Sequence, residues 1–379
     1  MRVLGASLVA LLVAVVATTG AASAQPGIEF KMGFKALADL IPDVVGRPLA
    51  KEQHNPENGD ALQPTTTGMM VWRKADNWTA FTDGATTWVN GPYGVQERPN
   101  GDRFKWEGLP DLVPSASPGD EIGVPGAVLS QDLLVAWYGT PWTPLMGILG
   151  RYTGAELAEG LQRQADAYAS LTNKKIVPCY ELIGVVAMGS PSDNGLWRRR
   201  EAPEVIDSML AQARVHGFRL ILDVQMGRSR VEDELEYLRP YLEQPDVYLA
   251  LDPEFDMEVG QEPGEELGHT VSGEVNYALG LLEKIVLDEG LPPKVLIVHQ
   301  FRLSMLPDKE KIGRSPVVDL VLDADGFGSQ AVKRDTYRAV METPLQFAGI
   351  KMFYNHDPDL FTPAQVMALD PAPSVVVYQ

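Results

Sequence analysis

Residues Val247 to Asp256 read VYLALDPEFD, an apolar run that stops in two carboxylates, Asp252 and Glu254. Side chains two apart on a strand share a face, so alternation would point both acids the same way. Pro253 lies between them and cannot extend a central ladder. The stretch therefore predicts a buried strand that ends where its acids begin.

Short apolar runs of this kind recur along the C-terminal two-thirds of the chain, separated by stretches with helical spacing. Strands that alternate with helices favour parallel βαβ units, and roughly eight runs suit a closed (β/α) barrel. We therefore predict an α/β fold, a (β/α)8 TIM-type barrel that ends on its last strand. The predicted strands are 133–139, 176–182, 219–225, 247–255, 294–301, 318–328, 347–354 and 374–379. The predicted helices are 152–172, 203–216, 232–242 and 272–289.

A doubly wound sheet that binds a dinucleotide would also alternate strands and helices. Such a sheet has a G-x-G-x-x-G turn after its first strand. Residues 138–144, at the end of the first predicted strand here and after it, read YGTPWTP and lack this motif. The polar residues that follow most of the strands instead favour a barrel, whose working face is the ring of strand C-termini.

The first residues have the pattern of a secretory signal peptide. Arg2 precedes an apolar run over 3–17, and Ala22-Ser23-Ala24 offers a cleavage site after residue 24. The run is shorter than the ~20 residues that a membrane span needs. We expect a secreted, extracellular protein that is free of the membrane after cleavage and associates with the cell wall.

Charge and cysteine content exclude several other classes. The formal net charge is −19, which repels nucleic acid and other polyanions. Cys179 is the only cysteine, so an intramolecular disulfide and a multi-cysteine metal site are excluded. Its place in an apolar run favours a buried, inert thiol. No cofactor is predicted.

Residues 27–108 differ from the predicted barrel in composition and residue pattern, and they predict a small, mostly β module. Phe34 and Leu37 belong to a helical repeat that has to end before Pro42, and two or three strand-like runs follow. Residues 109–126 are rich in Pro, Gly, Ser and Asp and predict a linker, so the barrel domain is predicted over 127–379. The module holds four of the seven tryptophans: Trp72, Trp78, Trp88 and Trp106.

The motifs FKALADLIPDVVGRPL, VWRKADNWTAFTDG and TWVNGPYG give this module a resemblance to a segment found ahead of exported bacterial cell-wall hydrolases. It is also similar to LGFP-type cell-wall repeats through Gly46-Arg47-Pro48-Leu49, Gln63 and residues 68–72, GMMVW. These resemblances imply attachment to a wall or polysaccharide. The alternative is that the tryptophans fill the core of a small domain.

Several acids are predicted at the barrel mouth, and their proximity would raise some of their pKa values and place proton donors beside acceptors. Glycosidic cleavage needs such a pair. We predict Glu254 as the acid/base and Asp325, or with less support Asp323, as its partner, with Asp252 and Asp223 orienting them. The residues predicted to bind substrate are Tyr138, Trp142, Glu181, Gln225, His299, Asp323, Lys351 and Tyr354. The structural alternatives are helix caps for Asp223 and Asp323 and an ion pair between Glu254 and Arg228.

Through LDVQMGRS, ALDPEFDM, VLIVHQF and DGFG, the barrel resembles secreted barrel proteins of actinobacteria and related lineages that have no assigned activity. Its layout also looks like that of retaining glycosidases whose carboxylates come from strands four and six. The segment Asp252-Pro253-Glu254 is similar to the D-x-E end of the chitinase strand-four motif, whose preceding acids are missing here. The similarity to the secreted barrel proteins implies a fold and a compartment but no substrate, whereas the glycosidase-like layout implies a polysaccharide or glycan substrate.

Two other functions stay open at this point. A metal-assisted hydrolase or isomerase would use Glu181, Asp223, Glu254, His299 and Asp323 as ligands, although the histidines form no H-x-H or H-E-x-x-H pair. The chain would otherwise be a non-catalytic protein that binds carbohydrate or the wall.

Overall fold

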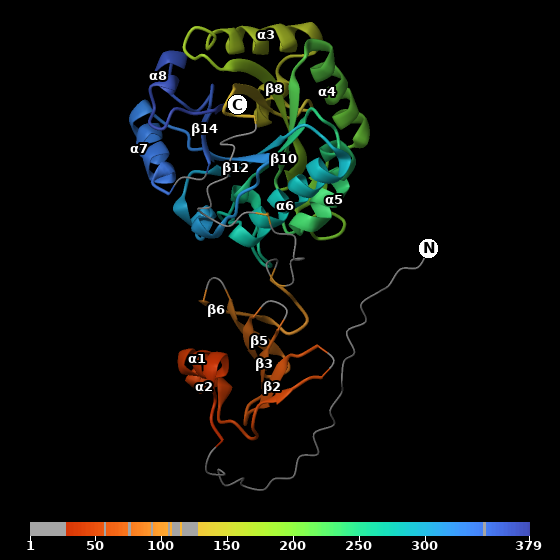
Figure 1. Ribbon diagram of the computed structural model, residues 1–379, viewed down its shortest axis with the longest axis vertical. Helices are drawn as coiled ribbons and strands as arrows, with labels where there is room; N and C mark the ends of the chain where they lie inside the picture. Colours follow the sequence, from red (N-terminus) through yellow and green to blue (C-terminus); the bar gives the residue numbers. More distant parts are fainter. Residues whose placement is uncertain are drawn as a thin grey trace. The chain divides into compact units, whose positions relative to one another are not determined.

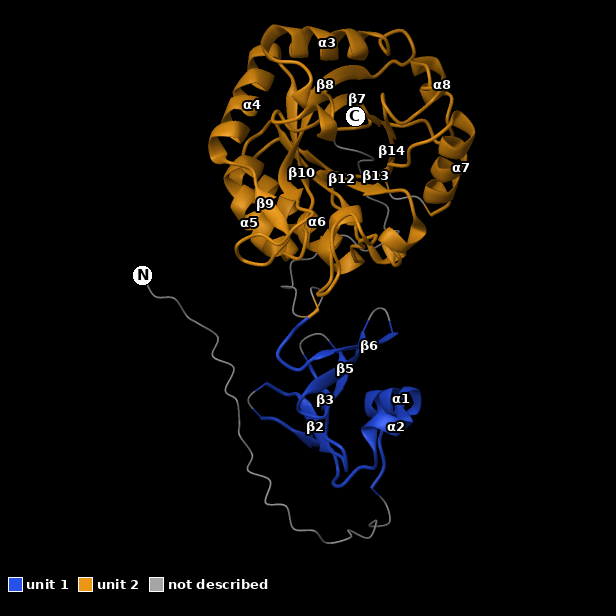
Figure 2. Cartoon of the chain, turned by 180° about the vertical axis from the view of Figure 1, so that it is seen from behind, with its two compact units in different colours: residues 1–103 blue, residues 104–379 orange. Residues whose placement is uncertain are grey.

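The computed structural model describes residues 28–56, 58–74, 77–91, 94–104, 107, 114–115, 128–343 and 346–379. The chain forms two compact units, Met1–Arg103 and Phe104–Gln379 (Figure 2). The predicted signal peptide, Trp106 and all of the predicted linker except Pro114 and Ser115 lie outside the described residues. No helix in these described ranges is long and apolar enough to cross a membrane.

The second unit is a closed parallel barrel, which confirms the predicted TIM-type fold (Figure 1). Each strand pairs in parallel with the next, and β15 pairs with β7 to close the ring. Around the ring the strands are β7 (Asp132–Gly139), β8 (Lys175–Ala187), β10 (Arg219–Val224), β11 (Val247–Leu251), β12 (Lys294–Gln300), β13 (Val318–Ala324), β14 (Phe347–Met352) and β15 (Val375–Tyr378). The outer helices are α3 (Gly154–Asp166), α4 (Pro203–His216), α5 (Val231–Leu242), α6 (Ser272–Glu289), α7 (Gln330–Met341) and α8 (Pro363–Met367).

The strands are apolar on both faces because each face packs on a different layer. Alternate residues of β7, Leu133 and Val135, join the cluster that includes the helices. Leu134 and Ala136 join a second cluster made by inward side chains, and Cys179 from β8 lies there too. Burial raises the pKa of the Cys179 thiol, so it stays protonated. The two lower levels of the barrel interior are therefore filled mostly by apolar groups.

Strand β8 is longer than predicted because its end pairs with an antiparallel strand, β9 (Arg198–Arg200). This strand consists of three consecutive arginines. Arg198 and Arg200 place their Nε atoms 2.7 and 2.8 Å from the carboxylate oxygens of Glu234, a fully buried residue of α5. Two of the three arginines therefore form ion pairs with a buried carboxylate.

The first unit contains α1 (Met32–Leu40), which ends before Pro42 as predicted, and α2 (Pro42–Val45). Their apolar side chains Phe34, Leu37 and Val45 pack against Met70 and Phe81 from the sheet. The sheet is antiparallel, with six strands where two or three were predicted. Its strands are β1 (Gln53–His54), β2 (Ala61–Pro64), β3 (Met69–Trp72), β4 (Thr79–Thr82), β5 (Thr86–Gly91) and β6 (Gly94–Pro99).

Candidate active site

A polar level closes the carboxyl end of the barrel interior, above the apolar levels. Its members are inward side chains of successive strands, and each is 2% exposed or less. They are Tyr138 (β7), Glu181 (β8), Asp223 (β10), Asp252 (directly after β11), His299 (β12), Asp323 (β13) and Lys351 (β14). Carboxylates, an imidazole and an ammonium group therefore meet away from bulk water.

His299 is held between two carboxylates. Its Nδ1 lies 3.0 Å from Oδ2 of Asp323, and its Nε2 lies 3.1 Å from Oε1 of Glu181. A carboxylate only accepts, so both ring nitrogens donate and the ring is an imidazolium. Burial and the charge of Lys351 oppose this, but the hydrogen bonds to Asp323 and Glu181 prevail and raise the pKa of His299 well above its usual value. His299 is therefore a fixed cation of the mouth.

Lys351 is the second cation. Its Nζ lies 3.1 Å from Oδ2 of Asp325 and 3.7 Å from the centroid of the Tyr138 ring, a cation–π contact. Burial disfavours the ammonium form, but the carboxylates of Asp325 and Asp252 outweigh it and raise the pKa of Lys351 above its usual value. Asp325 therefore has a charged partner at hydrogen-bond distance.

A chain of hydrogen bonds connects the acids of β10 and β11. Tyr138 donates its hydroxyl to Oδ2 of Asp223 at 2.8 Å. The amide of Gln225 donates to the Tyr138 hydroxyl at 3.0 Å and to Oδ2 of Asp252 at 3.3 Å. The amide oxygen of Gln225 accepts from the backbone N–H of Ala187, so the amide is held in one orientation. The chain holds the two carboxyls in fixed positions relative to each other.

Asp223 and Asp252 hold their protons more tightly than ordinary carboxyls. Burial, followed by the negative charge of Asp252, raises the pKa of Asp223 to about 8. Burial also raises the pKa of Asp252. No cation lies at hydrogen-bond distance of either group within the described part of the chain. Asp223 is therefore protonated near neutral pH, beside the negative charge of Asp252 that raises its pKa.

Five buried carboxylate oxygens of the mouth have no hydrogen-bond partner among the described residues. Buried polar atoms almost always find a partner, so these oxygens are positions for protons, water or a ligand hydroxyl. They are Oε2 of Glu181 and the Oδ1 atoms of Asp223, Asp252, Asp323 and Asp325.

Glu254 lies at the more open edge of this cluster. It belongs to a 3-10 turn, η3 (Pro253–Phe255), that follows β11, and it is only partly buried. Burial, then the charges of Asp252 and Asp325, raise its pKa to about 8. Arg228 does not pair with it: its guanidinium lies 4.7 Å from the Trp197 ring centroid and its Nε donates to the carbonyl of Gln261. Glu254 is therefore a protonated carboxyl that a substrate from solution can reach.

Trp142 presents an aromatic face in the loop after β7, with 59% of its surface exposed. Its indole N–H donates to Oε2 of the buried Glu201 at 2.6 Å, which fixes the ring. Sequence reasoning missed Glu201, because it comes from 59 residues away and nothing local marks it. Trp197, by contrast, is buried and its face is covered by Arg228.

The structure does not bring Tyr354 to the cluster. Its hydroxyl donates to Oε1 of Gln164 at 3.0 Å, and its ring stacks on Tyr378 with centroids 5.5 Å apart. Both contacts lie on the outer side of the barrel wall, toward α3. Tyr354 also lines a hollow of about 480 Å³ there, with Trp137 and Arg151.

No group of three or more His, Cys, Asp or Glu side chains within the described ranges is arranged to hold a metal ion. His299, the imidazole of the predicted ligand set, already bridges Asp323 and Glu181. The metal-assisted hypothesis therefore gains no support from the geometry.

Comparison with known proteins does not assign this chain to a family. No family model matches it, and no curated protein matches it either.

Proposed function

We propose that the barrel is a glycoside hydrolase-like enzyme that cleaves an extracellular or cell-wall polysaccharide. One observation carries the proposal: Glu254 combines a raised pKa, partial exposure and two neighbouring carboxyls, Asp252 and Asp325. A protonated carboxyl beside an ionised one is the pair that glycosidic cleavage uses.

In the proposed reaction, Glu254 gives its proton to the glycosidic oxygen as the bond from that oxygen to the anomeric carbon breaks. Asp325, paired with Lys351, is the carboxylate that faces the positive charge developing on the sugar. Water then supplies a hydroxyl to the anomeric carbon, and its second proton returns to Glu254. The remaining acids set the local charge, and Trp142 stacks on a sugar ring next to the scissile bond.

The place of action follows from the N-terminal part of the chain. The signal-peptide pattern over residues 1–24 supports export, and the N-terminal module would hold the enzyme on insoluble wall material. A tethered second binding site raises the effective concentration of the barrel at its polymer.

The test compares wild type with Glu254→Gln, which keeps the side chain's shape and removes its titrating oxygen. The assay measures reducing ends released from peptidoglycan, chitin and soluble oligosaccharides. Glu265→Gln, an exposed acid in the same loop, is the matched control. We expect a loss of at least about a hundredfold in kcat for Glu254→Gln and none for Glu265→Gln.

Equal turnover in wild type and Glu254→Gln would remove Glu254 from the mechanism. Binding to a glycan array without released reducing ends in the wild type would instead identify a binding protein. Tightly bound stoichiometric metal, with activity lost to chelators, would favour the metal-assisted alternative.

A further inference from the structure

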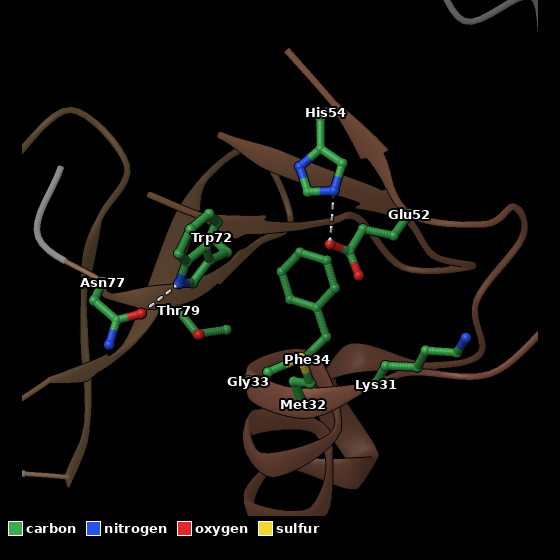
Figure 3. A pocket seen from close by; sticks show the side chains of 9 residues that line it. All are labelled: Lys31, Met32, Gly33, Phe34, Glu52, His54, Trp72, Asn77 and Thr79. Atoms are coloured by element: carbon green, nitrogen blue, oxygen red, sulfur yellow. Dashed lines mark hydrogen bonds and ion pairs between the residues drawn. The ribbon is translucent and has the colours of Figure 1, made fainter. Parts of the chain in front are cut away.

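A hollow of about 500 Å³ lies in the N-terminal unit, between the start of α1 and the sheet (Figure 3). Small-molecule sites commonly have volumes of about 300–1,000 Å³ and combine aromatic walls with a few polar groups. This hollow is lined by Lys31, Met32, Gly33, Phe34, Glu52, His54, Trp72, Asn77 and Thr79.

The walls of the hollow are held in place by specific contacts. Trp72 packs against the core of the module, and its indole N–H donates to Oδ1 of Asn77 at 2.8 Å. On the helix side, a Cβ at Gly33 would lie 2.5 Å from Oγ1 of Thr79. The start of α1 therefore approaches β4 as closely as a glycine allows, and the hollow has two fixed sides.

The backbone around the hollow is unusual. Only three non-glycine residues in the described ranges have a positive φ, and two of them, Met32 (φ 44°) and Asn77 (φ 60°), line it. Asn tolerates this conformation, whereas Met rarely adopts it. Such positions gather at ligand clamps and active sites. Met32 is also 91% exposed, so burial of its side chain does not explain its conformation.

The lining chemistry selects a class of ligand. The carboxylate of Glu52 and the imidazole of His54 lie 3.5 Å apart on the rim, opposite the Trp72 side (Figure 3). A ligand with hydroxyl groups could hydrogen-bond to both of these groups, whereas a purely apolar ligand would make no use of them. A peptide bound by strand addition would need a longer edge than the two residues of β1.

We propose that this hollow is a saccharide-binding site that attaches the protein to an insoluble polysaccharide. A sugar ring would place its apolar face on Trp72 and direct its hydroxyls toward Glu52, Asn77 and Thr79, which supply acceptors and donors. The inference rests on the proposed function only for the identity of the polymer, which the barrel would cleave.

The test uses the full chain carrying Glu254→Gln, so that the polymer is not consumed. Binding to purified peptidoglycan, chitin and cellulose is measured by sedimentation across a range of polymer concentrations. Trp72→Ala removes the aromatic wall. The double variant Glu52→Ala/His54→Ala removes the rim, whose residues are exposed and outside the core. Lys35→Ala, an exposed residue of α1 outside the hollow, is the control.

We expect binding to at least one polymer, weakened about tenfold or more by Trp72→Ala and by the rim variant, and unchanged by Lys35→Ala. If circular dichroism shows that Trp72→Ala does not fold, the binding of the rim variant alone tests the proposal. No binding to any of the three polymers, or full binding by the rim variant, would overturn the assignment. Binding lost instead with Trp142→Ala would place attachment on the barrel and overturn it too. The reducing-end assay on the wild type tests the hydrolase proposal independently of this binding experiment.

Discussion

Replacing Lys351 with Met tests whether the mouth is held together by its buried cations. The variant keeps the unbranched stem of the side chain and removes the ammonium group that lies 3.1 Å from Asp325. Both residues are buried, so Asp325 would lose its nearest cation and keep His299, whose Nδ1 lies 3.6 Å from its Oδ2. Breaking a buried pair in this way costs about 3–5 kcal/mol. We expect that loss in the free energy of unfolding at pH 7.

The loss has a predictable pH dependence. The positive charge of Lys351 lowers the pKa of Asp252 and Glu254, so its removal leaves these carboxyls more easily protonated in the folded state. The folded variant therefore binds more protons than the folded wild type, and its stability falls more steeply as pH rises from 5 to 7. Urea unfolding followed by fluorescence at both pH values gives the two free energies. We expect a clearly smaller loss at pH 5, where protonation of these carboxyls offsets the missing positive charge.

Lys294→Met is the matched control for this experiment. Lys294 is also buried in the barrel, but its Nζ donates to the carbonyls of Gln244 and Val247 at 2.6 and 2.9 Å. Burial lowers its pKa to about 8, so it stays protonated at both pH 5 and pH 7. Its removal should cost stability equally at the two values. Losses for Lys351→Met that are equally insensitive to pH, or below about 1 kcal/mol, would refute the charge argument.

Three further outcomes are expected. Trp142→Ala should raise KM about tenfold on a soluble oligosaccharide with kcat nearly unchanged, because stacking binds ground and transition states alike; a fall in kcat alone would contradict this. Gly349→Ala would put a Cβ 2.5 Å from Oδ1 of Asp323, so the Asp323 carboxylate has to move away from His299. The pKa of the His299 imidazole, measured by NMR titration, should therefore fall. Asp223 and Glu254 have a pKa of about 8 in the folded protein and about 4 in the unfolded chain. The folded state therefore binds more protons, and the free energy of unfolding of the wild type, measured in urea, should fall as pH rises from about 4 to 8. A rise over that range would contradict the assignment.

The barrel could be predicted from the sequence because parallel strands buried on both faces read as continuous apolar runs. The run predicted at 294–301 is β12 (Lys294–Gln300), and the helix predicted at 272–289 is α6. The extension of β8 could not be predicted, because it depends on pairing with β9, a non-local contact. Helix α7, QAVKRDTYRAVM, was missed because it is polar overall and its buried side includes a lysine, Lys333.

The candidate site was predictable in its members but not in their connections. The strand does end at Leu251, where the acids begin, but Pro253 starts a 3-10 turn. The alternation of a strand therefore does not relate Asp252 to Glu254, and their different burial reflects the turn. The partners of His299 lie 24 and 118 residues away along the chain, so no local pattern could have identified them.

The arrangement of the two cations explains how six carboxyl groups share one end of a barrel. His299 faces Asp323 and Glu181, and Lys351 faces Asp325, so the carboxylates of that side are compensated. Asp223, Asp252 and Glu254 have no such partner at hydrogen-bond distance in the described residues, and burial raises the pKa of each of them. The mouth is thereby divided into a side whose carboxylates face cations and a side whose carboxyl pKa values are raised. Glu254 and Asp325 interact across that division, so a bond placed between them would meet a proton on one side and a negative charge on the other.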